Sequence, residues 1–99
     1  MMLSMDEELN AAVAAKAAVD TQSTAPLSSA TITILREAIR AAMPATMLLS
    51  GEHHSEARHE AAIALSDLIA GPPTKARIDR AGSALKDWLK ELRQASLSQ

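Results

Sequence analysis

Apolar residues recur at helical spacing along most of the chain, and the pattern is clearest near the C-terminus. Over residues 75–95 they alternate by three and four, which is typical of a helix that packs along one stripe. The members of this seam are Ile78, Ala81, Leu85, Trp88, Leu92 and Ala95, with Leu89 beside it. The pattern predicts a helix over about 75–95 that is capped by Thr74 and has Ala84 on its outer face.

A second helix is predicted immediately before this one, over about 52–70. It ends at Gly71, Pro72 and Pro73, because a C′ glycine followed by prolines cannot continue a helix. Helices joined by so short a connection pack side by side. We therefore expect an antiparallel helical hairpin over residues 52–95, followed by a tail at 96–99.

The middle of the chain predicts a third amphipathic helix, over residues 29–50, that starts near Ser28 or Ser29 and is kinked at Pro44. Its apolar stripe comprises Ile32, Leu35, Ile39, Ala42 and Met43. Further apolar residues widen this stripe, which favours packing against more than one neighbour. Residues 20–28 are rich in hydroxyl side chains and have no helical period, so they predict a linker.

Residues 1–20 predict an alanine-rich helix, opened by a capping box at Ser4 and Glu7. Its sizeable apolar anchors are Leu9, Val13 and Val19, so we expect this helix to dock weakly. Together the four segments predict a single all-α domain over residues 1–99, a small four-helix arrangement built on the C-terminal hairpin.

Composition narrows the chemistry that this domain can perform. The 99 residues are 47% hydrophobic and include no cysteine and one aromatic residue, a tryptophan. A disulfide framework, a thiolate site and a platform for stacking several bases are therefore excluded. With three glycines and no Gly-x-Ser-x-Gly elbow, neither a phosphate-cradling loop nor a hydrolase nucleophile is indicated. We expect no enzyme activity and no cofactor.

Location and general partners follow from the same counts. The formal net charge of −2 argues against nucleic acid as a partner. The sequence contains no run of about 18 apolar residues, so no membrane span is predicted. The absence of cysteine is consistent with a reducing compartment, and we expect the protein to be cytoplasmic.

One segment carries the spacing of metal ligands. Glu56 and His59 form a Glu-x-x-His pair, which places a carboxylate and an imidazole on one helix face. Two such pairs build dinuclear metal sites in helical bundles, but this chain has one. A solvated first turn is the simpler interpretation, and a metal-binding helical dimer remains an alternative.

Charge is distributed unevenly along the chain. Residues 1–70 contain four basic and nine acidic side chains, whereas residues 71–99 contain six basic and three acidic ones. One flank of the last predicted helix is basic and carries Lys75, Lys86, Lys90 and Arg93. This flank could bind a small anion or nucleic acid, or it could balance the acidic stripe of the preceding helix. Both interpretations remain open.

Several apolar residues are candidates for contact with a partner. The candidates are Ile32, Leu35, Ile39, Met43, Ile63 and Trp88. Ile63 is predicted to project into an acidic stripe, and Trp88 to lie in the core or to anchor an interface. Because a domain of this size buries a modest share of its surface, self-association into a homo-oligomer is also expected.

The hairpin segment resembles a recurrent bacterial pattern. An Ala-x-x-x-Leu helix at residues 61–65, the Gly-Pro-Pro-Thr turn and a Leu-x-x-x-Leu helix at residues 85–89 are similar to helical hairpins of bacterial immunity (anti-phage conflict) proteins. The resemblance covers about residues 57–95. It implies a coupling or adaptor role and carries no catalytic residues. The sequence thus favours a non-enzymatic protein-interaction module, an adaptor, regulator or inhibitor.

Overall fold

A computed structural model describes residues 5–42 and 56–97 of the chain. Four helices account for almost all of these residues: α1 (Met5–Thr21), α2 (Ser29–Ala42), α4 (Glu56–Ala70) and α5 (Lys75–Leu97). The predicted all-α class is confirmed. The predicted cap at Ser4, the kink at Pro44 and the candidate contact residue Met43 lie outside the described residues.

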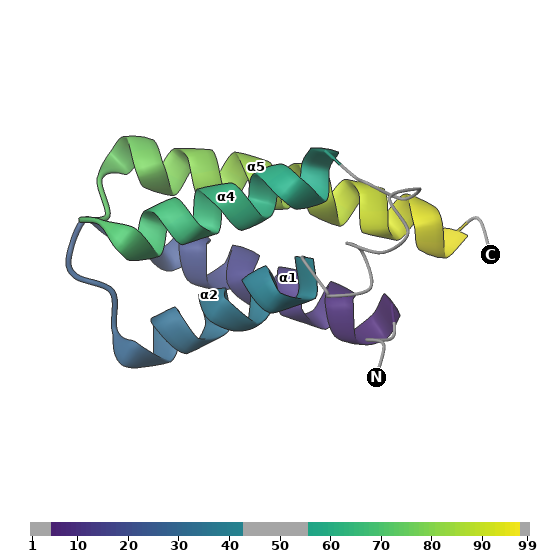
Figure 1. Ribbon diagram of the computed structural model, residues 1–99, viewed down its shortest axis with the longest axis horizontal. Coiled ribbons are helices and arrows are strands. Elements are labelled where there is room, and N and C mark those ends of the chain that lie inside the picture. Colours follow the sequence, from purple (N-terminus) through teal and green to yellow (C-terminus); the bar gives the residue numbers. More distant parts are fainter. Residues whose placement is uncertain (1–4, 43–55, 98–99) are drawn as a thin grey trace.

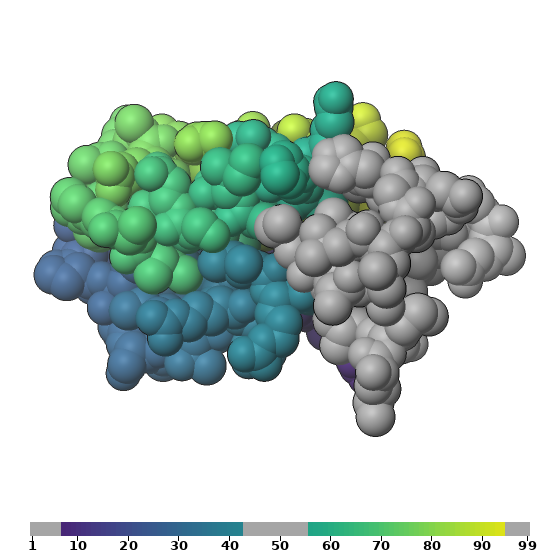
Figure 2. Space-filling view, in the orientation of Figure 1, coloured from purple at the N-terminus to yellow at the C-terminus, as the bar shows by residue number. Residues whose placement is uncertain are grey.

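The helices form an up-down-up-down bundle that measures 39 × 25 × 21 Å (Figure 1). Each helix packs against the next described one along the chain, and α1 closes the ring by packing against α5. The hairpin of α4 and α5 is antiparallel, as predicted (Figure 1). Figure 2 shows one long face of the bundle, on which α2 and α4 lie side by side. Each of the four described helices therefore has two neighbours.

Short polar side chains define where two helices begin. The Ser28 hydroxyl accepts a hydrogen bond from the backbone N–H of Thr31 at 3.1 Å, and the Thr74 hydroxyl accepts one from the N–H of Arg77 at 3.3 Å. Each bond satisfies a backbone donor that has no partner within its own helix. The predicted starts of α2 and α5 are thereby confirmed.

Helix α4 ends at Ala70, at the predicted stop. The backbone of Gly71 is not in the left-handed conformation typical of a helix-capping glycine. A Cβ at this position would meet the guanidinium of Arg77, which is the end of a flexible side chain and can move aside.

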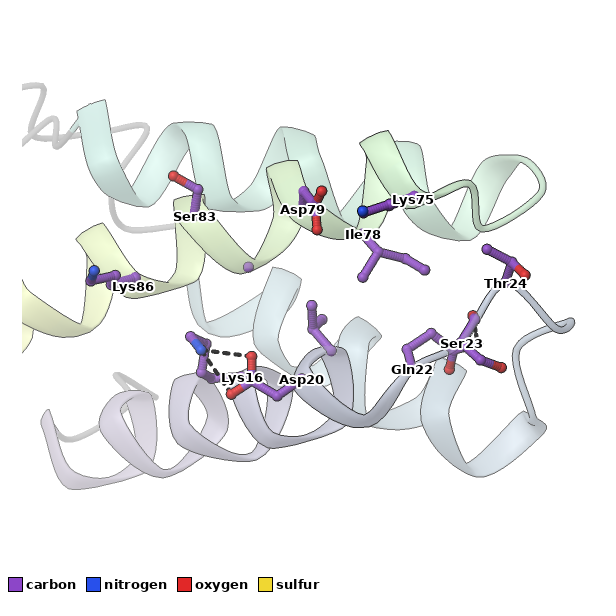
Figure 3. A pocket seen from close by; sticks show the side chains of 12 residues that line it. Lys16, Asp20, Gln22, Ser23, Thr24, Lys75, Ile78, Asp79, Ser83 and Lys86 are labelled. Atoms are coloured by element: carbon purple, nitrogen blue, oxygen red, sulfur yellow. Dashed lines mark hydrogen bonds and ion pairs between the residues drawn. The ribbon is translucent and has the colours of Figure 1, made fainter.

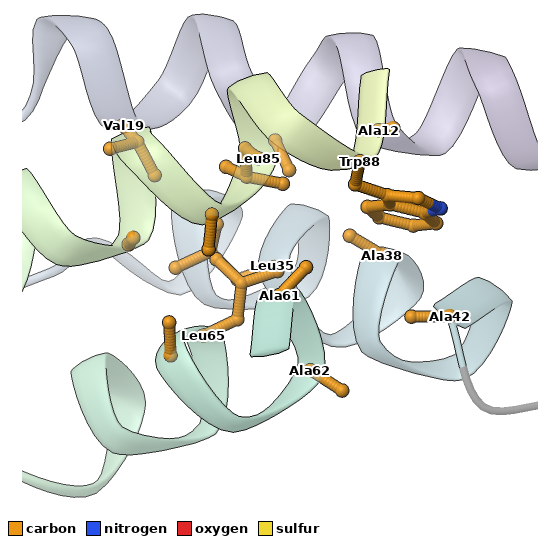
Figure 4. Packing of buried hydrophobic residues seen from close by; sticks show 14 of the residues in the cluster. Ala12, Val19, Leu35, Ala38, Ala42, Ala61, Ala62, Leu65, Leu85 and Trp88 are labelled. Carbon is orange, nitrogen blue, oxygen red and sulfur yellow. The ribbon is translucent and has the colours of Figure 1, made fainter. Parts of the chain in front are cut away.

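The core combines a few large side chains with many alanines (Figure 4). Its largest fully buried side chains are Trp88, Leu35, Leu65, Leu68 and Leu85. Alanines from all four helices, together with Val19, Leu89 and Leu92, make up the rest of the buried core, and no polar side chain is buried among the described residues. Small residues allow the helix backbones to approach closely, so the alanine-rich composition is compatible with a packed interior.

Helix α1 packs through two of its three predicted anchors, because Val19 is buried and Leu9 is partly buried against the core. Its buried residues are Ala12, Ala15 and Val19, whereas Val13 is 43% exposed. The prediction of Val13 as an anchor is wrong, because Val13 lies about 100° around the helix from Ala12. Position on the helix, rather than side-chain size, decides what α1 buries between α2 and α5.

Helix α5 buries a wider arc than the predicted seam. Ala81, Leu85, Trp88 and Leu92 are buried as expected, but Ala84 is also buried, with 5% of its surface exposed. Its prediction as an outer-face residue is wrong, because α5 packs against both α4 and α1. A single heptad stripe serves one neighbour, and two neighbours require a second stripe. The helix also extends to Leu97, into the predicted tail.

Candidate functional site

A groove of about 610 Å³ runs between the C-terminal half of α1 and the N-terminal half of α5 (Figure 3). We call it the α1–α5 groove. Its lining comprises Lys16, Val19, Asp20, Gln22, Ser23, Thr24, Lys75, Ile78, Asp79, Gly82, Ser83 and Lys86. Two of the predicted anion-binding residues, Lys75 and Lys86, therefore lie in one groove. The other two, Lys90 and Arg93, are exposed farther along α5 and do not line it.

The charges of the α1–α5 groove are arranged unequally. On the α1 side, the Lys16 ammonium donates to both carboxylate oxygens of Asp20, at 2.7 and 2.8 Å. On the α5 side, Lys75 and Lys86 flank Asp79. Three lysines and two aspartates leave the groove with one excess positive charge, in a chain whose net charge is −2.

Ion pairs cross the hairpin, but they are formed by arginines that do not belong to the predicted basic flank. Arg80 donates to Glu60 through Nε at 3.0 Å and through a terminal nitrogen at 2.8 Å. Arg77 lies 3.6 Å from the carboxylate of Asp67. The acidic stripe of α4 is thus balanced by two arginines outside the predicted basic flank. Among the described residues, none of the four flank residues forms an ion pair.

A second depression, the apolar hollow, lies where the two described loops meet, and its volume is about 310 Å³. Both loops are at the same end of the bundle (Figure 1). The lining comprises Thr24, Pro26, Leu27, Ile32, Ile69, Gly71, Pro72 and Pro73. One predicted contact residue, Ile32, is among them.

The remaining residues predicted to contact a partner differ in how far they are exposed to solvent. Leu35 is 0% exposed, so its prediction as an interface residue is wrong. Trp88 is 1% exposed and lies in the core, which is the first of the two positions predicted for it. Helices α2 and α5 each have two neighbours within the chain, and the centres of their apolar stripes are buried there. Ile39 is half-buried against the core. Ile63 is 40% exposed on α4, as predicted.

The predicted metal ligands line an acidic depression. Glu56 and His59 line it together with Ala57, Glu60 and Asp87. Within residues 5–42 and 56–97, no three histidine or acidic side chains lie close enough together to hold a metal ion. The described geometry therefore adds no metal ligand to the Glu-x-x-His pair.

The sequence analysis did not predict one polar cluster, which is formed by Glu8, Arg58 and Trp88. Glu8 of α1 accepts a hydrogen bond from the indole N–H of Trp88 at 3.3 Å and lies 3.0 Å from a terminal guanidinium nitrogen of Arg58. The cluster joins α1 to α5 and, across the bundle, to α4. A buried indole N–H needs an acceptor, so a partner for Trp88 could have been anticipated. The sequence does not indicate which of the many carboxylates it is.

In comparisons with known proteins, no family model, no curated protein and no solved structure matches this chain. Among the described residues, no helix combines the length and the apolar character needed to cross a membrane.

Proposed function

We propose that the protein is a non-enzymatic helical interaction module, an adaptor, regulator or inhibitor, that binds a protein partner through the apolar hollow. The observation that carries this proposal is the lining of the hollow. Of its eight residues, Thr24 alone has a polar side chain. Concave apolar surfaces of this kind receive the anchor side chains of protein partners.

The hollow is built from restrained parts of the chain. Ile32 and Ile69 project from α2 and α4, which pack against each other. Pro26, Pro72 and Pro73 restrict the backbone of the two loops, because the proline ring fixes one backbone dihedral angle. A surface with little freedom to lose binds with a smaller entropic cost. An aliphatic or aromatic side chain of the partner would remove this apolar lining from water.

The sequence supports the same type of role in two further ways. The resemblance of residues 57–95 to hairpins of bacterial immunity proteins favours an adaptor in such a system. The absence of cysteine favours the cytoplasm as its location. The modest core of so short a chain makes a second copy of this chain the first partner to test.

The test is a mass measurement in solution, by sedimentation or native mass spectrometry, alone and with proteins encoded beside this one. Pro72→Glu places a charge at the exposed rim of the hollow without altering a helix. Ser66→Glu, on the exposed surface of α4 and outside the hollow, is the matched control. We expect a dimer or a heteromeric complex that is lost in Pro72→Glu and kept in the control. A chain that stays monomeric with every candidate, or a complex that tolerates Pro72→Glu, would contradict the proposal.

A further inference from the structure

We infer that the α1–α5 groove binds a small amphipathic anion, with a carboxylate or phosphate head and a short apolar body. The groove is separate from the apolar hollow, with which it shares only Thr24. This inference is therefore independent of the proposed interaction function. It rests on an unexplained glycine, on the charges of the groove and on its volume.

The glycine is Gly82, in the interior of α5 and on the lining of the groove. A glycine at such a position weakens a helix relative to alanine. Packing does not require it, since an added Cβ would lie 3.7 Å from Cγ1 of Val19, at ordinary contact distance. Its backbone is not in the left-handed region either. What the missing side chain does provide is an open groove above Val19.

The apolar part of the groove lies beside its positive charges (Figure 3). Val19, Ile78 and Gly82 provide a surface for a hydrocarbon body. Lys16 is engaged by Asp20, so the anionic head pairs with either Lys75 or Lys86, which lie eleven residues apart along α5 with Asp79 between them. Lysine ammonium groups form charge-assisted hydrogen bonds with carboxylates and phosphates. The combination selects a ligand that is both apolar and negatively charged.

The size and the rim of the groove are compatible with such a ligand. Its volume of about 610 Å³ lies within the range that is typical of small-molecule sites. The rim at the end of α1 is fixed by local hydrogen bonds, because the Gln22 amide donates to the carbonyls of Ser23 and Ala25 at 2.8 and 2.9 Å. A ligand would therefore meet a preformed edge, which lowers the cost of binding.

The test is a titration of the ¹⁵N-labelled full chain, followed by NMR chemical shifts, with three probes that share an octyl chain. Octanoate and octyl phosphate distinguish the two possible heads, and octyltrimethylammonium reverses the charge. We expect at least one anion to saturate the protein below its micelle concentration. The largest shifts should fall at residues 16–24 and 75–86. The cation should bind at least tenfold more weakly.

Variants then assign the site. Replacing Lys75 and Lys86 together by Gln should weaken anion binding about tenfold or more, and Lys90→Gln, on the same helix but outside the groove, should leave it unchanged. Gly82→Leu should abolish binding by filling the groove. Gly82→Ala should raise the melting temperature by about 2–8 °C, since it improves the helix, and should weaken binding less than Gly82→Leu.

Four results would overturn the inference. They are no saturable anion binding, equal binding of the cationic probe, equal loss in Lys90→Gln, and shifts centred on another face of the bundle. If Gly82→Leu does not fold, as judged by circular dichroism, the lysine pair and its control decide the question alone.

Discussion

Replacing Leu85 by alanine tests the packing of the bundle most directly. This side chain is 0% exposed and lies in the core where α5 meets its neighbours (Figure 4). The substitution removes three carbon atoms, worth about 2.4 kcal/mol at about 0.8 kcal/mol for each buried methylene. A residual cavity on the order of 50 Å³ adds about 1 kcal/mol. We therefore expect a loss of about 3–4 kcal/mol of unfolding free energy.

The assay is urea denaturation followed by circular dichroism, with a thermal melt alongside. A domain of this length has a total stability of about 5–15 kcal/mol, so the loss is a large fraction of it. The melting temperature should fall by more than about 10 °C. Lys90→Ala, at an exposed position of the same helix, should change the stability by less than about 0.5 kcal/mol. Equal effects of the two substitutions, or a loss below about 1 kcal/mol at Leu85, would refute the assigned packing of α5.

Three further predictions address other parts of the molecule. Ala84→Ser should cost about 1–2 kcal/mol in the same denaturation assay by placing a hydroxyl in the core, whereas Ala76→Ser, on the exposed surface of α5, should cost less than about 0.5 kcal/mol. Glu8→Ala should cost about 1–3 kcal/mol in thermal melts, because its carboxylate joins three helices, and an unchanged melt would mean that the cluster does not stabilise the fold. Elemental analysis of the purified protein should find no stoichiometric transition metal, and one metal per chain that is lost in His59→Ala would reverse this view.

The helices could be predicted from the sequence because their signals are local. Thr74 marks the start of α5 through a hydroxyl that accepts a backbone hydrogen bond. Pro72 and Pro73 mark the end of α4, because proline cannot continue a helix. The prediction of the buried seam of α5 is largely confirmed for the same reason. The predicted seam is too narrow, because a second neighbour buries Ala84, and the spacing of apolar residues in α5 alone cannot reveal that neighbour.

The candidate surfaces were harder to predict, because they depend on which helices become neighbours. Lys75 and Lys86 were identified as one basic flank, but the groove that contains them needs Lys16 and Val19 from α1. The apolar hollow likewise combines two loops that are distant in the chain. Leu35 appeared available to a partner when its helix was considered alone, and its burial follows from the closed ring of four helices.

That closed ring also has a consequence for the order in which the molecule folds. Three of its four packed pairs join helices that follow one another in the described chain, and only the pair of α1 and α5 joins distant segments. Chains dominated by such local contacts fold within microseconds to milliseconds. The pairing of α1 with α5 closes the longest loop and carries the largest entropic cost, so it should form late. Amide hydrogens of α1 should then exchange through partial openings that leave the α4–α5 hairpin protected.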